Sequence, residues 1–392
     1  MNILLISTLY PVKEGHYKTE VVTHALHNFV KEWLHSNNVM VIRPVFKNMT
    51  PIPFYYYPRK NISPGRYQLD NVDVFAVPIY RIPIIEIFFT HKVESFLSAQ
   101  QFNPDVIIAH SGANIPLGSI ISKKLKTPLI SGIHFSDMLN LEKNNHTQRC
   151  FIKAVHHSDG IACRSPHILN WLRTRQLFPA DKIFPAYSGI DESVIDFSAL
   201  KRKEGLPWKK DQPLVISCTA SSLIKSKHTD TIIKALSSLE KNWILHVIGD
   251  GEEREHLASL TKSLKLEKKV IFHGYLSHRE TFRMLSLSHV FAKPSHPETF
   301  GIVYLEAMAK GNIVIGGANT GIDGLIENGV HGFLVSPGNV DELKTLFENI
   351  CFHFDPTYLK QILQRSFSLC QKMTSQHMAE EYIRNISEVI NF

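Results

Sequence analysis

Short runs of β-branched residues alternate with amphipathic helical stretches along most of this sequence. NILLIS (2–7) and DVIIAH (105–110) are examples from the first half, and WILHVIGD (243–250) and HVFAKPS (289–295) are examples from the second. Parallel strands need a crossover connection, which is usually a helix, so this alternation predicts parallel sheets covered by helices on both faces. The expected fold is therefore α/β and doubly wound.

The alternation occurs twice, on either side of a charged segment that lacks apolar periodicity. At 392 residues the chain is too long for one ordinary core and suits two domains of roughly 150–200 residues each. The segment KRKEGLPWKKDQP (201–213) has the composition of an exposed linker. We therefore predict an N-terminal domain over 1–200, a C-terminal domain over 214–370, and a final helix over 371–392 that packs back on the N-terminal domain. Ligands of open parallel sheets bind at the carboxyl ends of the strands, so we expect substrates in the cleft between the two domains.

The composition limits the partners that the chain can have. Lysine and arginine number 43 against 36 aspartates and glutamates, an excess that favours phosphate-bearing or membrane partners and falls short of a nucleic-acid-binding surface. No apolar run reaches the ~18 residues of a membrane span. The start MNILLISTLYP has the pattern of a first buried strand rather than a signal peptide, and the five cysteines form no CxxC pair. We expect a cytoplasmic protein that is at most peripheral to the inner face of the membrane.

The segment 51–68 mixes aromatic and basic residues. Such a mixture suits docking to an anionic lipid surface, and it suits equally well a surface loop with aromatic side chains packed beneath it. Prolines and a glycine argue against the amphipathic helix that would favour the membrane, so both interpretations stay open. The residues concerned are Phe54, Tyr55, Tyr56, Tyr57, Arg59, Lys60 and Arg66.

The most informative stretch is SHPETFGIVYLEAMAKGNIVIGG (295–317), in which a polar loop follows a strand and a helix is expected to begin near Phe300. The first amides of a helix have no partner within the helix and carry a partial positive charge. The backbone at this helix start is therefore a candidate site for a diphosphate. The residues that supply it are Phe300, Gly301, Ile302 and Val303.

An acidic residue stands on either side of this helix start. Glu298 precedes the helix, where it faces whatever the diphosphate carries, and Glu306 lies in a small apolar setting in which an unpaired carboxylate is costly. At ~1.5 Å per residue their separation is at most about 12 Å, comparable to the reach from a ribose across a diphosphate to a sugar. Two glutamates with this spacing, taken alone, more often lie on a solvent-exposed helix face or form ion pairs than bind a ligand. The PETFG loop and the glycines that follow favour a nucleotide-sugar site.

This stretch resembles the Glu-x7-Glu signature of the retaining glycosyltransferases of family 4, which have the GT-B fold of two Rossmann-like domains that face across a cleft. The resemblance implies that Glu298 lies at the donor sugar as a catalytic residue and that Glu306 binds ribose hydroxyls. It also places Gly249 and Tyr275 in the donor site. The other matching motifs are IGDGEERE (248–255), HGYLS (273–277), GANTGIDGLI (317–326) and NGVHGFLVSPGN (328–339).

Members of that family carry an arginine and a lysine after the first strand of the C-terminal domain, and both contact the diphosphate. In ASSLIKSKHT (220–229), Lys227 matches this lysine and is assigned a catalytic role. Ser222 stands where the arginine is expected, and His228 replaces a glycine. Lys225 is a candidate for the missing charge, although a lysine lacks the bidentate fork of arginine.

The N-terminal half resembles the family more weakly. Gly15 stands in the position of a glycine-rich turn of the donor site, but His16 replaces its second glycine. His134, in SGIHFSD (131–137), matches a histidine that the family places against the donor sugar, and we assign it a catalytic role. His110 occupies a similar position at the end of the run DVIIAH, although a histidine at a strand end is often structural.

The resemblance implies a hexosyltransferase that moves a sugar, with retention of configuration, from a UDP- or GDP-sugar to a hydroxyl of a glycan or lipid-linked acceptor. Polysaccharide or glycolipid biosynthesis is the expected setting. The sequence has no Asp-x-Asp, no His-Glu-x-x-His and no Cys/His cluster, so we expect neither a metal nor another cofactor.

Four other functions are suggested by the same fold or by one of the motifs. GDGEER (249–254) lacks the third glycine of a dinucleotide-binding motif, which argues against a dehydrogenase. A phosphorylase or sugar-nucleotide epimerase of the same fold would use the same cleft, and product analysis would separate them from a transferase. A non-catalytic sugar-nucleotide-binding subunit is the remaining alternative, because Ser222 and His16 depart from the family pattern.

Overall fold

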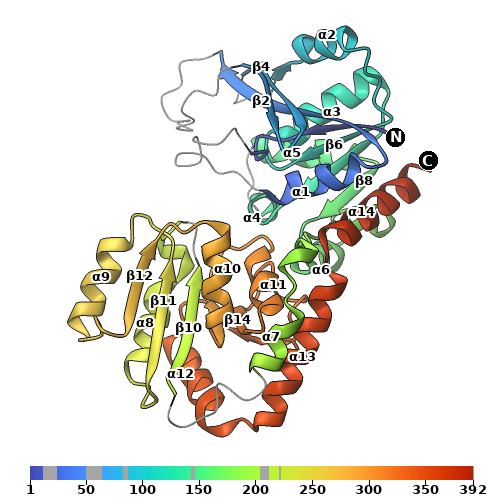
Figure 1. The fold of residues 1–392 in the computed structure, drawn as a ribbon. Coiled ribbons are helices and arrows are strands. Elements are labelled where there is room, and N and C mark those ends of the chain that lie inside the picture. Colours follow the sequence, from blue (N-terminus) through green and yellow to red (C-terminus); the bar gives the residue numbers. More distant parts are fainter. Residues whose placement is uncertain are drawn as a thin grey trace. The chain divides into compact units, whose positions relative to one another are not determined.

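The computed structural model of the chain describes residues 1–11, 24–49, 64–82, 87–142, 146–203, 212–219 and 222–391. It divides into two compact units, one made of Met1–Ser188 with Ser375–Phe392 and the other of Gly189–Thr374 (Figure 1). Each unit has its own sheet and its own hydrophobic core.

The sheet of the first unit is almost entirely parallel. In the described residues its strands lie in the order β3-β4-β2-β1-β6-β7-β8-β9, and β5 pairs with β4. Only β3 and β5 run antiparallel to their neighbour β4. The strands are β1 Asn2–Ile6, β2 Asn38–Asn48, β3 Gly65–Leu69, β4 Val72–Ile82, β5 Ile87–Phe89, β6 Val106–His110, β7 Leu129–Ile133, β8 Gly160–Cys163 and β9 Ile183–Pro185. The helices are α1 His24–Trp33, α2 His91–Ala99, α3 Asn114–Leu125, α4 Phe135–Leu141, α5 His146–His156, α6 Pro166–Arg175, the 3-10 turn η1 Ala180–Lys182 and α14 Ser375–Ile390.

The sheet of the second unit is parallel throughout its described strands. Its order is β12-β11-β10-β13-β14-β15, which places β10 and β13 at the centre. The strands are β10 Leu214–Thr219, β11 Trp243–Ile248, β12 Val270–Gly274, β13 Val290–Lys293, β14 Ile313–Gly317 and β15 Phe333–Val335. The helices are α7 Phe197–Lys203, α8 Thr229–Ser237, α9 Arg254–Ser263, α10 His278–Leu287, α11 Ile302–Ala309, α12 Val340–Glu348 and α13 Pro356–Lys372, with the short turns η2 Glu192–Val194, η3 Lys225–Lys227 and η4 Asn349–His353.

The central strands are buried on both faces because their sequences are continuously apolar. Every residue of β6, β7 and β14 is buried. The prediction of an α/β fold with two doubly wound parallel sheets is confirmed.

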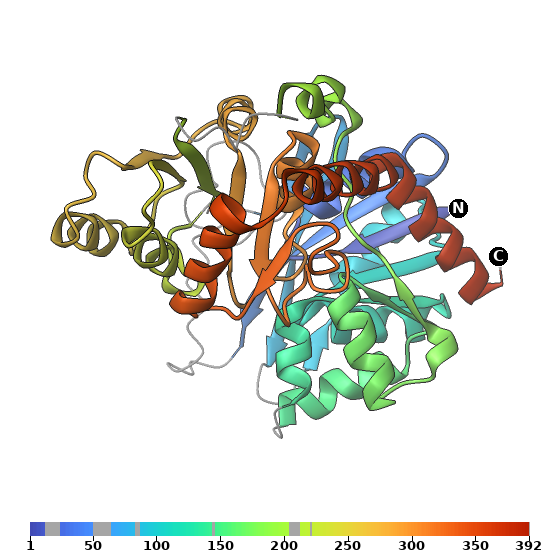
Figure 2. The ribbon, with the colours of Figure 1, turned by 90° about the horizontal axis from the view of Figure 1, so that it is seen from below.

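The last helix belongs to the first unit although it follows the second unit in sequence. Helix α14, drawn in red at the C-terminal end of the chain (Figure 2), packs against α1. The indole of Trp33 donates a hydrogen bond of 3.2 Å to the carbonyl of Ala379. The ring of Tyr382 packs at 5.3 Å, centroid to centroid, against both Phe29 and Trp33. A large part of the packing surface of α1 is therefore supplied by the C-terminal end of the chain.

The division between the units falls after Ser188, earlier than the linker predicted at 201–213. The segment in between packs on the second unit: the Asp196 amide donates to the Ala309 carbonyl at 3.1 Å. The buried Lys203 ammonium donates to three carbonyls, those of Leu285 at 3.2 Å, Ser288 at 2.5 Å and Lys310 at 2.7 Å. Lys203, which the sequence places in a charged linker, thus donates hydrogen bonds to carbonyls at the ends of two helices.

Of the residues predicted to dock on a membrane, Arg66 lies within the described ranges. Within the described ranges, no helix has the length and apolar character needed to cross a membrane. Arg66 forms an exposed ion pair with Asp73, at 2.6 Å between Nη2 and Oδ2. The other residues of the predicted docking segment, Phe54, Tyr55, Tyr56, Tyr57, Arg59 and Lys60, lie outside the described residues.

Candidate active site

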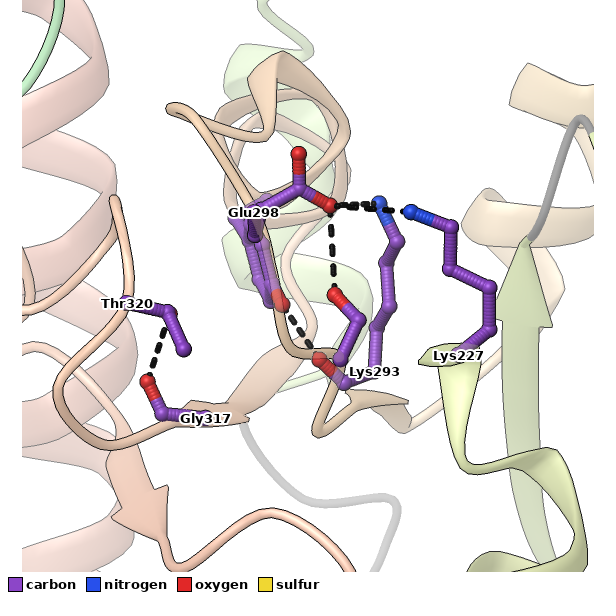
Figure 3. A network of polar contacts seen from close by, with 7 residues as sticks. Lys227, Lys293, Glu298, Gly317 and Thr320 are labelled. Atoms are coloured by element: carbon purple, nitrogen blue, oxygen red, sulfur yellow. Dashed lines mark hydrogen bonds and ion pairs between the residues drawn. The ribbon is translucent and has the colours of Figure 1, made fainter. Parts of the chain in front are cut away.

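The segments that follow two neighbouring strands, β13 and β10, bring one carboxylate and two ammonium groups together at the carboxyl edge of the second sheet. Lys293 ends β13, Glu298 lies in the loop that follows, and Lys227 ends the turn η3 after the neighbouring strand β10. The Glu298 Oε2 atom lies 2.6 Å from the Lys293 Nζ and 3.6 Å from the Lys227 Nζ (Figure 3). The Ser295 hydroxyl donates to the same oxygen at 3.1 Å. Glu298 and Lys227 were predicted from the sequence to share a site, and the structure brings them together.

The charges of this cluster fix the protonation state of Glu298. Burial alone would raise the pKa of the Glu298 carboxyl, but the charges of Lys293 and Lys227 and the hydrogen bonds from Lys293 and Ser295 lower it to about 2. Burial and the charge of Lys293 lower the pKa of Lys227, and its attraction to Glu298 opposes this shift. The carboxylate is therefore ionised at neutral pH.

Backbone contacts hold the loop that carries Glu298 in place. The Gly321 amide donates to the Glu298 carbonyl at 2.8 Å, and a Cβ at Gly321 would lie 1.8 Å from the Thr299 carbonyl oxygen. The Tyr304 hydroxyl donates to the Lys293 carbonyl. The GANTGIDGLI segment (317–326) thus positions the acid by a contact that only glycine allows.

Helix α11 begins at Ile302, close to the predicted start near Phe300. Gly301 precedes it with φ of +76°, a left-handed conformation that favours glycine. The Phe300 side chain is buried, so at this position only the backbone is a candidate for ligand contact. Ile302 and Val303 supply amides of the first helical turn, which have no carbonyl partner within the helix.

Glu306, on the same helix, differs from Glu298 in its surroundings. Burial raises the pKa of its carboxyl, and the charges of His278 and Lys293 only partly oppose this. In the described part of the chain, no group donates a hydrogen bond to the Glu306 carboxylate. A partly buried carboxylate of this kind is suited to accept hydrogen bonds from a ligand.

The other predicted donor residues lie in adjoining loops. The loop after β11 contacts the loop after β10, because the Leu223 amide donates to the Asp250 carbonyl at 2.9 Å. It also contacts the end of β12, because the Gly249 amide donates to the Gly274 carbonyl at 2.7 Å. Tyr275 is 63% exposed, and its hydroxyl donates to the same Asp250 carbonyl at 3.2 Å. Lys225, in η3, is exposed.

The residue that replaces the family's glycine in this loop adopts a strained backbone. His228 has φ of +51° and ψ of +36°, a left-handed conformation. This explains why a glycine is expected there, since the conformation costs other residues about 1–2 kcal/mol.

In the first unit, His134 is the N-cap residue of α4 and follows the carboxyl end of β7. Its Nε2 lies 3.2 Å from the His110 Nδ1, and the His110 Nε2 lies 3.1 Å from the Tyr382 hydroxyl. Burial and the charge of Arg164 lower the pKa of His134 to about 3, so the imidazole is neutral at physiological pH. The Asp137 carboxylate accepts from the His134 amide at 2.9 Å. Gly15 and His16 lie outside the described residues.

Among the residues that sequence reasoning missed, Lys293 and Tyr382 make side-chain contacts with predicted site residues. Lys293 has a recognisable signal, a lysine at the end of the apolar strand VFAK directly before the PETFG loop. Tyr382 has no local signal, because it reaches His110 across 272 positions of sequence.

The described residues contain no group of three or more histidine, cysteine, aspartate or glutamate side chains that could hold a metal ion. One histidine pair lies on neighbouring strands, with His246 Nδ1 2.9 Å from His273 Nε2. This pair lacks a third ligand among the described residues.

Two doubly wound units, one with an acid and two lysines at the carboxyl edge of its sheet, define a GT-B type of protein. Among solved structures, sucrose-phosphate synthase of Thermosynechococcus elongatus matches with a TM-score of 0.76 at 16% identity, covering 100% of this chain and 99% of that one. HepE of Anabaena in complex with UDP matches with a TM-score of 0.71 at 17% identity, covering 98% and 99%.

Sequence comparison gives the family. The model of glycosyl transferases group 1 matches residues 200–351, and that of glycosyltransferase family 4 matches residues 51–194. N-acetyl-alpha-D-glucosaminyl L-malate synthase of Bacillus anthracis is 25% identical over 278 residues, which span 69% of this chain and 70% of that protein. Alpha-monoglucosyldiacylglycerol synthase of Streptococcus pneumoniae is 25% identical over 285 residues, 65% of this chain and 63% of that protein. The chain belongs to the family 4 glycosyltransferases and is a glycosyltransferase of the GT-B type.

Proposed function

We propose that the chain transfers a sugar from a UDP- or GDP-sugar to a hydroxyl of a glycan or lipid-linked acceptor, with retention of anomeric configuration. The observation that carries this proposal is the ionised Glu298 between Lys227 and Lys293 beside the start of α11. Lysines and helix amides suit a diphosphate, and a fixed carboxylate suits the sugar attached to it. A solved structure of similar fold is a complex with UDP, which supports a nucleotide sugar as the donor.

Each group has a role in the proposed reaction. The bond between the sugar and the diphosphate breaks while the acceptor hydroxyl attacks from the same face, and the hydroxyl proton passes to the leaving phosphate oxygen. Lys227 and the first amides of α11 stabilise the leaving diphosphate. Glu298 stabilises the charge that develops on the sugar, and Glu306 holds the ribose. His134, as a neutral imidazole, acts at the donor sugar.

The acceptor and the cellular location belong to the same proposal. One relative is named for a glycolipid, as alpha-monoglucosyldiacylglycerol synthase, and another is named for lipopolysaccharide core biosynthesis. These names support an acceptor in polysaccharide or glycolipid biosynthesis. They also fit peripheral association of a cytoplasmic enzyme with an anionic membrane.

The proposal is tested by adding a panel of nucleotide sugars, with their nucleosides as controls, and measuring thermal unfolding. A ligand at 100 times its Kd should raise the free energy of unfolding by about 2.7 kcal/mol, because it binds only the folded chain. We expect one UDP- or GDP-sugar to raise the Tm and its nucleoside to raise it much less at the same concentration. A panel in which no nucleotide sugar or nucleoside diphosphate raises the Tm would contradict the proposal.

We also propose that transfer needs no metal, because Lys227 and the α11 amides neutralise the diphosphate. Activity should therefore be the same with and without excess EDTA, measured with the donor identified in the panel. Loss of activity in EDTA that a divalent cation restores would show that this part of the proposal is wrong.

A further inference from the structure

The cluster around Glu298 holds more positive than negative charge within ion-pair distance. Lys293 and Lys227 both reach the same oxygen, Glu298 Oε2. Their side chains are only 9% and 18% exposed, and that of Glu298 is 13% exposed. Glu306 acts on this cluster through its charge, but it forms no ion pair among the described residues. A partly buried cation that lacks a full counter-charge is costly, so a bound anion would stabilise this arrangement.

One ammonium group lies at the end of a strand and the other in the turn after the neighbouring strand, and both reach Glu298 in the loop before α11. Lys293 ends the central strand β13, and Lys227 follows β10, which pairs with β13. The Lys293 Nζ also lies 5.7 Å from the ring centroid of Tyr304 in the first turn of α11. Figure 3 shows both lysine side chains directed toward Glu298, Lys293 from the end of β13 and Lys227 from the turn η3. An anion with two charged groups, such as a diphosphate, matches two cations placed in this way.

Lys293 has N–H donors that can bind such a ligand in addition to Glu298. An ammonium has three N–H donors, and the Lys293 Nζ makes one hydrogen bond to a described residue, to Glu298. Lys225, the other candidate for a second cation in this region, is exposed. The structure therefore favours Lys293 as the group that compensates for the serine at position 222.

We propose that Lys293 is a second phosphate-binding cation of the donor site. Together with Lys227 it binds the diphosphate of the nucleotide sugar, and Glu298 holds its ammonium in position. This inference rests on the proposed function and adds a binding residue to it.

The test replaces Lys293 with methionine in the full chain and measures the Kd of UDP and GDP and of the matching nucleosides. For the nucleoside diphosphate that the parent binds, we expect the Kd to rise about 10- to 100-fold, as for a lost charge-assisted hydrogen bond. The Kd of the nucleoside should stay unchanged. Lys293→Arg should keep most of the affinity. The control is Lys344→Met, which removes a surface lysine of α12 that lies 3.9 Å from Glu348.

The possible outcomes separate this inference from the proposed function. Equal losses for nucleoside and nucleoside diphosphate, or no loss for either, would overturn the role of Lys293 alone. A parent that binds neither UDP nor GDP would overturn the proposed function and this inference with it. If Lys293→Met does not fold, Lys293→Gln takes its place, since the amide can still donate to Glu298, and the same selective loss is expected.

Discussion

Glu298→Gln should lower kcat by about 10²- to 10³-fold, the typical cost of removing one electrostatic contact to a transition state. The Glu298 carboxylate is ionised at neutral pH and held in place by Lys293 and Ser295, so its charge is available without reorganisation. Glutamine has nearly the same shape and lacks the charge. Steady-state kinetics with the donor identified by thermal unfolding measures the effect.

The same substitution should leave nucleoside diphosphate binding at least as tight as in the parent. Without the carboxylate, Lys227 and Lys293 lose their shared counter-ion, and a diphosphate can replace it. We therefore expect a lower Tm of the unliganded variant and a larger rise in Tm on adding the nucleoside diphosphate. A variant that turns over like the parent would remove Glu298 from the chemistry, and one that no longer binds the diphosphate would assign it to binding.

Glu306→Gln should mainly raise the donor KM, because the loss of a charge-assisted hydrogen bond weakens donor binding by roughly 1.5–3 kcal/mol. The change in kcat should be smaller. The nucleoside diphosphate, which lacks the sugar, should lose affinity as well. Burial raises the pKa of the Glu306 carboxyl. On acidification this carboxylate therefore takes up its proton at a higher pH than an exposed glutamate does. The donor KM of the parent should therefore rise on acidification, and this rise should be absent in the glutamine variant.

A matched control is Glu348→Gln, since Glu348 is a partly exposed acid of α12 whose Oε1 atom lies 3.9 Å from the Lys344 Nζ. Its kinetics should equal those of the parent. If Glu306→Gln lowers kcat while the donor KM stays constant, Glu306 contacts the reacting sugar rather than the ribose. Unchanged kinetics for both glutamate variants at 298 and 306 would mean that the start of α11 is not the donor site.

Most of the fold could be predicted from the sequence because its central strands are continuous apolar runs. DVIIAH becomes β6 and WILHVIGD supplies β11, and each is followed by a helix. The division between the units could not be predicted, because the position of Lys203 in a charged run conceals its three carbonyl partners. Such partners come from segments remote in sequence, and local composition carries no information about them.

The candidate site could be predicted only in part. Glu298 and the helix that carries Glu306 form one local motif, so their spacing in the sequence places the two glutamates near each other. Lys293 also lies near this motif, but its contact with Glu298 depends on the path of the intervening loop. The contact between His110 and Tyr382 depends on the last helix returning to the first unit, which spacing cannot show. The roles of all these residues stay predictions until the variants are measured.

The position of α14 has a consequence for how the chain folds during synthesis. Nascent domains generally fold in order from the N-terminus. Here the side chains of Phe29 and Trp33 are covered by Tyr382, and the Trp33 indole bonds to Ala379. The ribosome must therefore translate the whole second unit before the surface of α1 can be covered. The first unit, whose synthesis begins first, therefore finishes folding last. Until α14 packs on α1, the side chains of Phe29 and Trp33 are accessible to chaperones and to other nascent chains.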